Sequence, residues 1–178
     1  MYDFNYIYDE VGLGSDWIVQ HEDNTVMKIV SNEVVIEGDN WAWTTYKDSI
    51  SSPVTRTTAK FTTKVSSSNF QLIIRANAGG PDGTAYMAKY SDNTISIIDY
   101  NGGSETELIL KNYPLTDNTA YYFEFIADNS DLTLNLKNSG GTTIDTITTT
   151  DSSYSTGSVV ISTHADFIFD DFKIEKFE

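Results

Sequence analysis

The fold is decided by residues 69–111, which read NFQLIIRANAGGPDGTAYMAKYSDNTISIIDYNGGSETELILK. Four runs of strand length lie in this stretch, and each places apolar residues at every second position. These residues are Phe70, Leu72 and Ile74, then Tyr86, Ala88 and Tyr90, then Ile95 and Ile97, and finally Leu108 and Leu110. A repeat of two residues is typical of strands with one buried face, because successive side chains point to opposite sides.

The four runs are separated by residues that favour tight turns. The breaks are residues 78–83 (AGGPDG), 92–93 (DN) and 101–103 (NGG), where Gly, Asn and Asp tolerate a positive φ. Because strands joined by such short turns run antiparallel, the stretch predicts an antiparallel meander. The rest of the chain must cover one face of this meander, and we expect function on the other face.

The remainder of the chain continues the pattern. Residues 26–30 and 33–37 are expected to form a hairpin, and residues 132–136 alternate Leu with polar side chains. About twelve strands at spacings of about 8–12 residues are typical of all-β proteins, and no window shows the 3.6-residue spacing of a helix. We therefore expect a single domain over residues 1–178: a two-sheet antiparallel β-sandwich (jelly roll) with essentially no helix.

The composition narrows the classes of partner. The formal net charge of −15 repels phosphate backbones and anionic membranes, which disfavours nucleic-acid binding. No apolar run approaches membrane-spanning length, so we expect no membrane insertion. The acidity indicates either ordinary solubility or the binding of divalent cations. Cysteine is absent, which excludes disulfides, thiolate metal sites and a cysteine nucleophile.

The amino terminus, MYDFNYIYDEVGLGSDW, lacks the basic and apolar segments of a secretory signal peptide. Either the protein leaves the cell without a signal, or a signal has been removed. Neither end carries a tag-like sequence, so we expect a complete gene product. We expect its location to be the virion surface or the extracellular space.

Aromatic and hydrogen-bonding residues predict a binding groove. Sugar rings stack on Trp and Tyr, while Arg, Asn, Asp and Gln bond to their hydroxyl groups. The residues that we expect to line such a groove are Trp41, Trp43, Gln71, Arg75, Tyr86, Tyr90, Asp99 and Tyr100. The alternative is that the aromatic residues are part of the core and that Arg75 pairs with a buried carboxylate.

Four segments resemble one known superfamily. They are DFNYIYDEVGLGSDWIV (3–19), KIVSNEVVIEG (28–38), FQLIIRAN (70–77) and DFIFDDFKIEKF (166–177). Together they resemble the concanavalin A-like lectin/glucanase superfamily, and within it the laminin-G-like jelly rolls of bacterial and phage proteins. The resemblance implies two stacked antiparallel sheets. It does not imply one function, because this scaffold carries hydrolases, lectins and structural modules.

The resemblance also allows a test for catalysis. The glucanases of the superfamily carry Glu-x-Asp-x-x-Glu on one strand, which supplies the two carboxylates that glycoside hydrolysis needs. The strand expected near that position carries Tyr86, Ala88 and Tyr90 instead. The acidic pair Glu105 and Glu107 has another spacing, which is more typical of a solvated strand face. We therefore expect no enzymatic activity.

Asp170 is the candidate metal ligand. In the strand FIFDDFKIE it is expected to share a face with Ile168, Phe172 and Ile174, where a carboxylate needs hydrogen bonds or a cation. The resemblance implies a structural calcium ion held by an aspartate of the last strand and a carbonyl of an early turn. Here these would be Asp170 and the turn at Asn32, and oxygen ligands suit Ca²⁺. The alternative is a structural aspartate held by hydrogen bonds.

These observations predict a non-catalytic adhesion or decoration module at a virion or cell exterior that binds carbohydrate. Its partner would be a glycan or a neighbouring virion or cell-surface protein. One alternative is a purely structural phage virion protein, in a capsid decoration or a tail, with no glycan ligand. A glycoside-active enzyme domain is the less favoured alternative.

Overall fold

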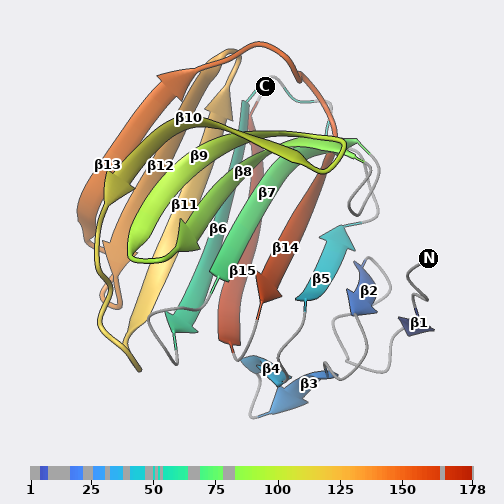
Figure 1. Ribbon diagram of the computed structural model, residues 1–178, viewed down its shortest axis with the longest axis vertical. Coiled ribbons are helices and arrows are strands. Elements are labelled where there is room, and N and C mark those ends of the chain that lie inside the picture. Colours follow the sequence, from blue (N-terminus) through green and yellow to red (C-terminus); the bar gives the residue numbers. More distant parts are fainter. Residues whose placement is uncertain are drawn as a thin grey trace.

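A computed structural model describes residues 5–7, 17–21, 26–30, 33–37, 41–46, 50, 52, 54–63, 69–77, 83–164 and 167–177. In these ranges fifteen strands form two stacked antiparallel sheets, and no helix occurs (Figure 1). The same ranges therefore hold no helix long and apolar enough to cross a membrane. The all-β, two-sheet antiparallel sandwich expected from the sequence is confirmed.

The sheet nearer the viewer in Figure 1, here called the front sheet, contains eight of these described strands. In spatial order they are β1 (Asn5–Ile7), β2 (Trp17–His21), β5 (Trp41–Tyr46), β14 (Ser158–His164), β7 (Asn69–Asn77), β8 (Thr84–Ser91), β9 (Thr94–Asn101) and β10 (Ser104–Asn112). The predicted meander is thus β7 to β10, and its neighbours are antiparallel.

The second sheet, here called the back sheet, contains the other seven. In spatial order they are β13 (Thr143–Thr150), β12 (Asp131–Asn138), β11 (Ala120–Asp128), β6 (Val54–Thr63), β15 (Phe167–Phe177), β4 (Glu33–Glu37) and β3 (Val26–Val30). The predicted hairpin of residues 26–30 and 33–37 is present as β3 and β4.

Two of the predicted turns have the backbone that their residues favour. Asp92 and Asn93 join β8 to β9 with φ values of 50° and 63°, and Gly102 and Gly103 join β9 to β10 with φ values of 55° and 84°. A positive φ at both central residues is the mark of the turn that matches the twist of a β-hairpin. The local sequence therefore sets the register of the meander.

Aromatic side chains from both sheets form the centre of the core. Phe61 of β6 stacks on Phe70 of β7 with ring centroids 4.6 Å apart, and Phe123 of β11 meets Phe61 edge to face at 4.9 Å. All three side chains are fully buried. Offset and edge-to-face pairs of this kind stabilise a core beyond the burial of their area.

The two sheets differ in how their outer faces are covered. On β11 and β12 buried residues alternate with partly exposed ones, as expected for strands with one face in the core. On β7, in contrast, residues 70–76 are all buried, and β8 is buried at residues 85–88 on both faces. The outer face of the front sheet is therefore hollowed or covered, and it is the candidate location for a site.

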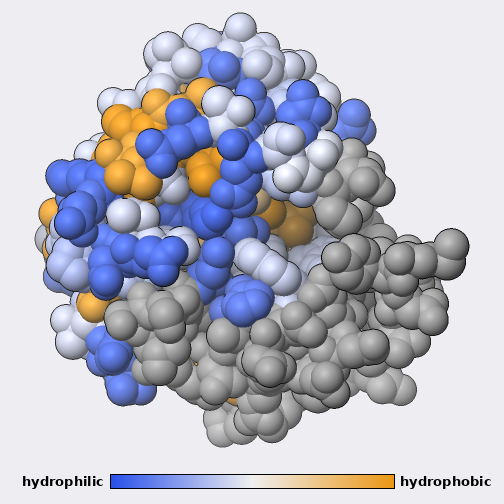
Figure 2. Space-filling view, in the orientation of Figure 1, coloured by the Kyte–Doolittle hydropathy of each residue, from blue (hydrophilic) through white to orange (hydrophobic). Residues whose placement is uncertain are grey.

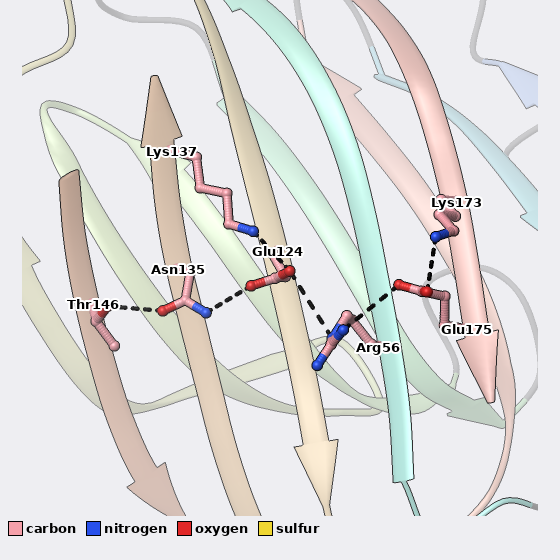
Figure 3. A network of polar contacts seen from close by, with 7 residues as sticks. All are labelled: Arg56, Glu124, Asn135, Lys137, Thr146, Lys173 and Glu175. Atoms are coloured by element: carbon pink, nitrogen blue, oxygen red, sulfur yellow. Dashed lines mark hydrogen bonds and ion pairs between the residues drawn. The ribbon is translucent and has the colours of Figure 1, made fainter. Parts of the chain in front are cut away.

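The outer face of the back sheet carries a network of polar contacts (Figure 3). Glu124 accepts hydrogen bonds of 2.8 Å from Asn135 and Lys137. Arg56 lies between two carboxylates, with its Nε 3.9 Å from Glu124 and its Nη1 3.8 Å from Glu175. Burial alone would raise the pKa of Glu124, but the two hydrogen bonds outweigh it and leave the pKa below its usual value. The charged and amide side chains of this network therefore pair with one another across neighbouring strands of the back sheet.

Candidate functional site

The outer face of the front sheet carries a second hydrophobic cluster, separate from the core. Its buried members are Trp43, Ile73, Ala76, Ala85, Met87, Ile98 and Val160, with the partly buried Trp41 and Tyr100 packed against them. Directly opposed residues of antiparallel strands share a face, so the register places these side chains side by side. Figure 2 shows apolar atoms at the bottom of a hollow over β7 and β14 on this face.

A row of polar side chains crosses the same face beside this cluster. Trp43 pairs with Ser162, Ser162 with Gln71, Gln71 with Lys89, and Lys89 with Ser96. Gln71 is 5% exposed, Ser162 6% and Ser96 4%. These three side chains form no hydrogen bond within the described part of the chain, and none of their polar atoms is fully closed to solvent. They are therefore available to a polar ligand.

One end of the row is aromatic. Trp41 and Trp43 alternate on β5 and so share a face, as the sequence predicts, and Trp43 is 8% exposed while Trp41 is half-buried. His164 lies beside Trp41, with ring centroids 5.1 Å apart and planes at 64°. The indole of Trp41 is thereby held edge to face against a neighbour, which fixes the surface that it offers.

Two buried polar atoms lie near this aromatic end. Oγ1 of Thr45 and Oδ1 of Asn69 are buried and have no hydrogen-bond partner in the described ranges. The register places Thr45 beside Val160 and Asn69 beside His164, on the outer face. Buried polar atoms without a partner are uncommon in folded proteins, and a bound water is the ordinary partner for such atoms.

Near the other end of the row, the charge of Lys89 is neutralised by an acidic side chain. Nζ of Lys89 lies 2.7 Å from Oε2 of Glu105, which stands opposite Tyr100 at the edge of the sheet. Tyr100 is one of the predicted groove residues, and it lies on the outer face with Trp41, Trp43 and Gln71. Four of the eight predicted residues are therefore on one face.

The other four predicted residues lie on the inner face, so the sequence-based placement of these side chains in an outer groove is wrong. Tyr86 and Tyr90 are fully buried in the core between the sheets. Asp99 stands opposite Tyr86 and accepts a hydrogen bond of 2.6 Å from the hydroxyl of Tyr154. Alternating aromatic residues on a strand were core residues here, as the alternative interpretation held.

Arg75 is the fourth of these inner residues. It sits in an irregularity of β7 between Ile74 and Asn77, with a φ of 54°, and is 3% exposed. Nη1 of Arg75 donates to the backbone oxygens of Asn129 at 2.7 Å and Tyr154 at 2.9 Å. Burial lowers the pKa of its guanidinium. Arg75 thus ties two connections of the back sheet to the front sheet.

The predicted metal site does not fit the residues around Asp170. Asp170 follows the buried Phe169 and pairs with Lys60, so it points away from the core, and the bulge between Asp170 and Lys173 then places Phe172 against the core. Oδ2 of Asp170 lies 3.4 Å from Nζ of Lys60, which supplies the positive charge that a cation would bring. The described residues hold no cluster of three metal-ligating His, Cys, Asp or Glu side chains. Asn32 lies outside the described residues.

Sequence reasoning missed the aliphatic half of this face. Ile73, Met87, Ile98 and Val160 are part of the outer cluster, but alternation alone assigned one apolar face to each strand. The continuous apolar run of residues 72–74 (LII) and its counterparts in β9 and β14 were the available signal, since strands buried on both faces read as unbroken apolar runs.

No protein-family model and no curated protein matches this chain. Its structure is nevertheless similar to solved structures. The carbohydrate binding module CBM66 from Bacillus subtilis superposes with a TM-score of 0.74 at 15% identity, over 90% of this chain and 96% of the module. A Bacillus subtilis protein of unknown function with a galectin-like fold gives 0.74 at 12% identity, over 99% and 98%.

A third similar structure is the exoplasmic/lumenal domain of VIP36 in its calcium-bound form, with a TM-score of 0.71 at 14% identity, over 96% of this chain and 88% of that one. That domain is also solved metal-free and with Ca²⁺ and Man3GlcNAc bound. Identities this low establish the fold alone, and the bacterial or phage subtype stays a prediction. The chain has the concanavalin A-like jelly-roll fold.

Proposed function

We propose that this chain is a non-catalytic glycan-binding module, and that its site is the outer face of the front sheet. The observation that carries the proposal is that two tryptophans lie on the same face as polar side chains that form no hydrogen bond in the described structure. Trp41 and Trp43 offer apolar surface to the C–H face of a sugar ring. Gln71 and Ser162, which have no hydrogen bond in the described structure, offer donors and acceptors to its hydroxyl groups.

The similar structures support this proposal through the names that they carry. One is a carbohydrate binding module, and another is a domain solved with Man3GlcNAc. The fold by itself carries many functions, so the argument rests on the residues of the face.

The proposal is non-catalytic because of where the acidic residues lie on the described part of this face. Glu105 and Glu107 share one exposed edge strand, and Lys89 already pairs with Glu105. Glycoside hydrolysis needs two carboxylates on opposite sides of the scissile bond, one of them shielded enough to stay protonated. The pair on β10 offers neither arrangement.

We further propose that the module acts in adhesion or decoration at the exterior of a virion or cell. The high negative charge supports this, because it keeps an exposed protein soluble and away from anionic surfaces. We include a structural calcium ion in this proposal only by analogy with the calcium-bound VIP36 domain, and not at Asp170. The proposed sugar contacts do not need Asp170, since this residue lies on the opposite sheet.

One observation favours the alternative of a purely structural virion protein. Leu110 and Ile144 are large exposed apolar side chains, 46% and 39% exposed. They flank the ion pair between Lys111 and Asp145, which joins the edges of the two sheets at 2.6 Å. An apolar patch at a sheet edge suits contact with a neighbouring protein.

A glycan array run beside light scattering tests the two proposals against each other. The glycan-binding proposal predicts retention of at least one class of neutral glycan by the monomeric protein. Retention of no glycan, together with assembly onto capsids or tails, would support the structural alternative and overturn the proposal.

A further inference from the structure

The outer face of the front sheet carries an aliphatic row that a plain sugar does not use. Val160 pairs with Ile73, Ile73 with Met87, and Met87 with Ile98, so that the four side chains cross β14, β7, β8 and β9 in line. The strand spacing makes this row about 14 Å long, and it lies one side-chain repeat, about 7 Å, from the polar row through Gln71. The two rows are thus within reach of a single sugar unit and its substituent.

The aliphatic row is recessed. Its four side chains are 3–9% exposed, although the back sheet does not cover this face. Figure 2 shows apolar atoms at the bottom of the hollow over β7 and β14. A floor with so little exposed surface suits a small apolar group better than the broad face of a ring, which the tryptophans are placed to receive.

The chemistry of the floor selects against a hydroxyl group. None of the four side chains carries a strong hydrogen-bonding group, so a sugar that places its hydroxymethyl group in the hollow loses a water partner without an equivalent replacement. A methyl group at the same position gains burial instead. The charge of the face adds a second condition, because Lys89 is already paired with Glu105 at 2.7 Å and does not call for an anionic sugar.

We propose that the ligand is a neutral glycan whose sugar carries a methyl group, either as the C6 methyl of a 6-deoxyhexose or as the methyl of an O-acetyl ester. The methyl group sits on Ile73 and Met87, while Gln71 and Ser162 bond to the ring hydroxyls. This inference rests on the proposed function and sharpens it by naming the class of ligand.

Two matched pairs of ligands test the inference with the full chain. L-fucose and L-galactose differ at C6, where the first has a methyl and the second a hydroxymethyl group. O-acetylated glucomannan and the same polymer after mild alkaline deacetylation differ only in the ester. We expect at least about tenfold tighter binding of the methyl-bearing member in one pair, the discrimination that a single methyl-sized group gives in an apolar pocket.

The outcomes separate this inference from the proposed function. Equal binding of both members in both pairs overturns the inference and leaves the glycan-binding proposal standing. Binding of none of the four overturns the inference, and an empty glycan array overturns the proposal as well. Tighter binding in the fucose pair identifies a 6-deoxy sugar, and tighter binding in the glucomannan pair identifies an ester.

Variants locate the selectivity on the proposed floor. Ile73→Thr should remove most of the preference for the methyl-bearing sugar, and Met87→Gln, which keeps the length of the side chain, provides a second variant if the first does not fold. Gln71→Ala should weaken the binding of both ligands of a pair to the same extent. The matched control is Ile126→Thr, because Ile126 is half-buried on the outward side of β11 in the back sheet. A preference unchanged in folded Ile73→Thr and Met87→Gln overturns the inference.

Discussion

The hydroxyl group of Tyr86 donates a hydrogen bond of 2.6 Å to Oδ1 of Asp151. The same hydroxyl oxygen accepts a hydrogen bond of 3.1 Å from the backbone N–H of Tyr154, and the same carboxylate oxygen accepts one of 2.7 Å from the N–H of Ser153. A buried side chain of β8 thereby holds the connection between β13 and β14 in place. Tyr86 acts on the fold, and a ligand on the outer face does not meet it.

Replacement of Tyr86 by Phe tests this role. We expect Tyr86→Phe to lower the free energy of unfolding by roughly 1–3 kcal/mol, since it removes a hydrogen bond to a carboxylate and leaves the partly buried N–H of Tyr154 without its acceptor. Urea unfolding followed by fluorescence measures the change. Glycan binding should stay at the wild-type level, and a folded, fully stable variant that no longer binds would contradict the assignment.

High pH should weaken the same connection. Burial, and after it the hydrogen bond to Asp151, raises the pKa of Tyr86 to about 12, and burial with the hydrogen bond to Asp99 raises that of Tyr154 further. Unfolded tyrosines titrate near 10. A pKa raised by folding stabilises the protein fully below about pH 10, and this contribution is lost as the pH rises through the folded value.

A spectrophotometric titration of tyrosinate checks this expectation. A fraction of the eleven tyrosines should ionise only well above pH 10, together with a fall in the urea midpoint. Ionisation of every tyrosine in one step near pH 10 by a protein that is still folded would show that these hydroxyls are not buried as described.

Gly157 is expected to tolerate no side chain. It has a φ of 151°, and a Cβ built there would lie 2.3 Å from the carbonyl carbon of Arg75 and 2.6 Å from the nitrogen of Ala76. Because both contacts are backbone atoms of β7, Gly157→Ala should destabilise the fold by about 1–3 kcal/mol or more. The control is Gly140→Ala, whose Cβ would meet the Asn138 side chain at 3.4 Å and should change the stability by less than about 0.5 kcal/mol. Equal thermal midpoints of the two variants would refute the close approach.

Asp170 is expected to act through Lys60 and not through calcium. Their charged groups are 3.4 Å apart and partly exposed, so Asp170→Asn should cost no more than about 1 kcal/mol. Melting curves of both proteins in calcium and in chelator decide the point. We expect the same calcium response from wild type and variant, and a rise in melting temperature that only the wild type shows would restore the calcium site.

The strands and turns of the meander could be predicted from the sequence because each is encoded locally. Alternation marked Phe70, Leu72 and Ile74 as one face, and the residues Asp92 and Asn93 adopt the positive φ that their types permit. The two-sheet fold follows from many such segments, each of which needs a partner for its apolar face.

The positions of the candidate side chains were predicted only in half, for two physical reasons. The first is that β7 and β8 are buried on both faces. Alternation alone could therefore not show whether Tyr86 and Tyr90 point into the core or to the outer face. The second is that a bulge shifts every later side chain to the opposite face. The irregularities after Ile74 and after Asp170 are of this kind: Arg75 turns to the inner side, and Phe172 packs against the core although Asp170 points away from it.

The central claim is that the outer face of the front sheet binds glycan through its tryptophans, and the affinity of Trp41→Ala for a glycan found on the array tests it most directly. Tyr122→Ala is the matched control, since it truncates a partly exposed aromatic side chain on the outer face of the back sheet. Titration calorimetry on proteins with wild-type circular dichroism should show at least about tenfold weaker binding for Trp41→Ala, as for an aromatic anchor of a binding site, and unchanged binding for Tyr122→Ala. Wild-type affinity in a folded Trp41→Ala protein, or an equal loss in both variants, would contradict the claim.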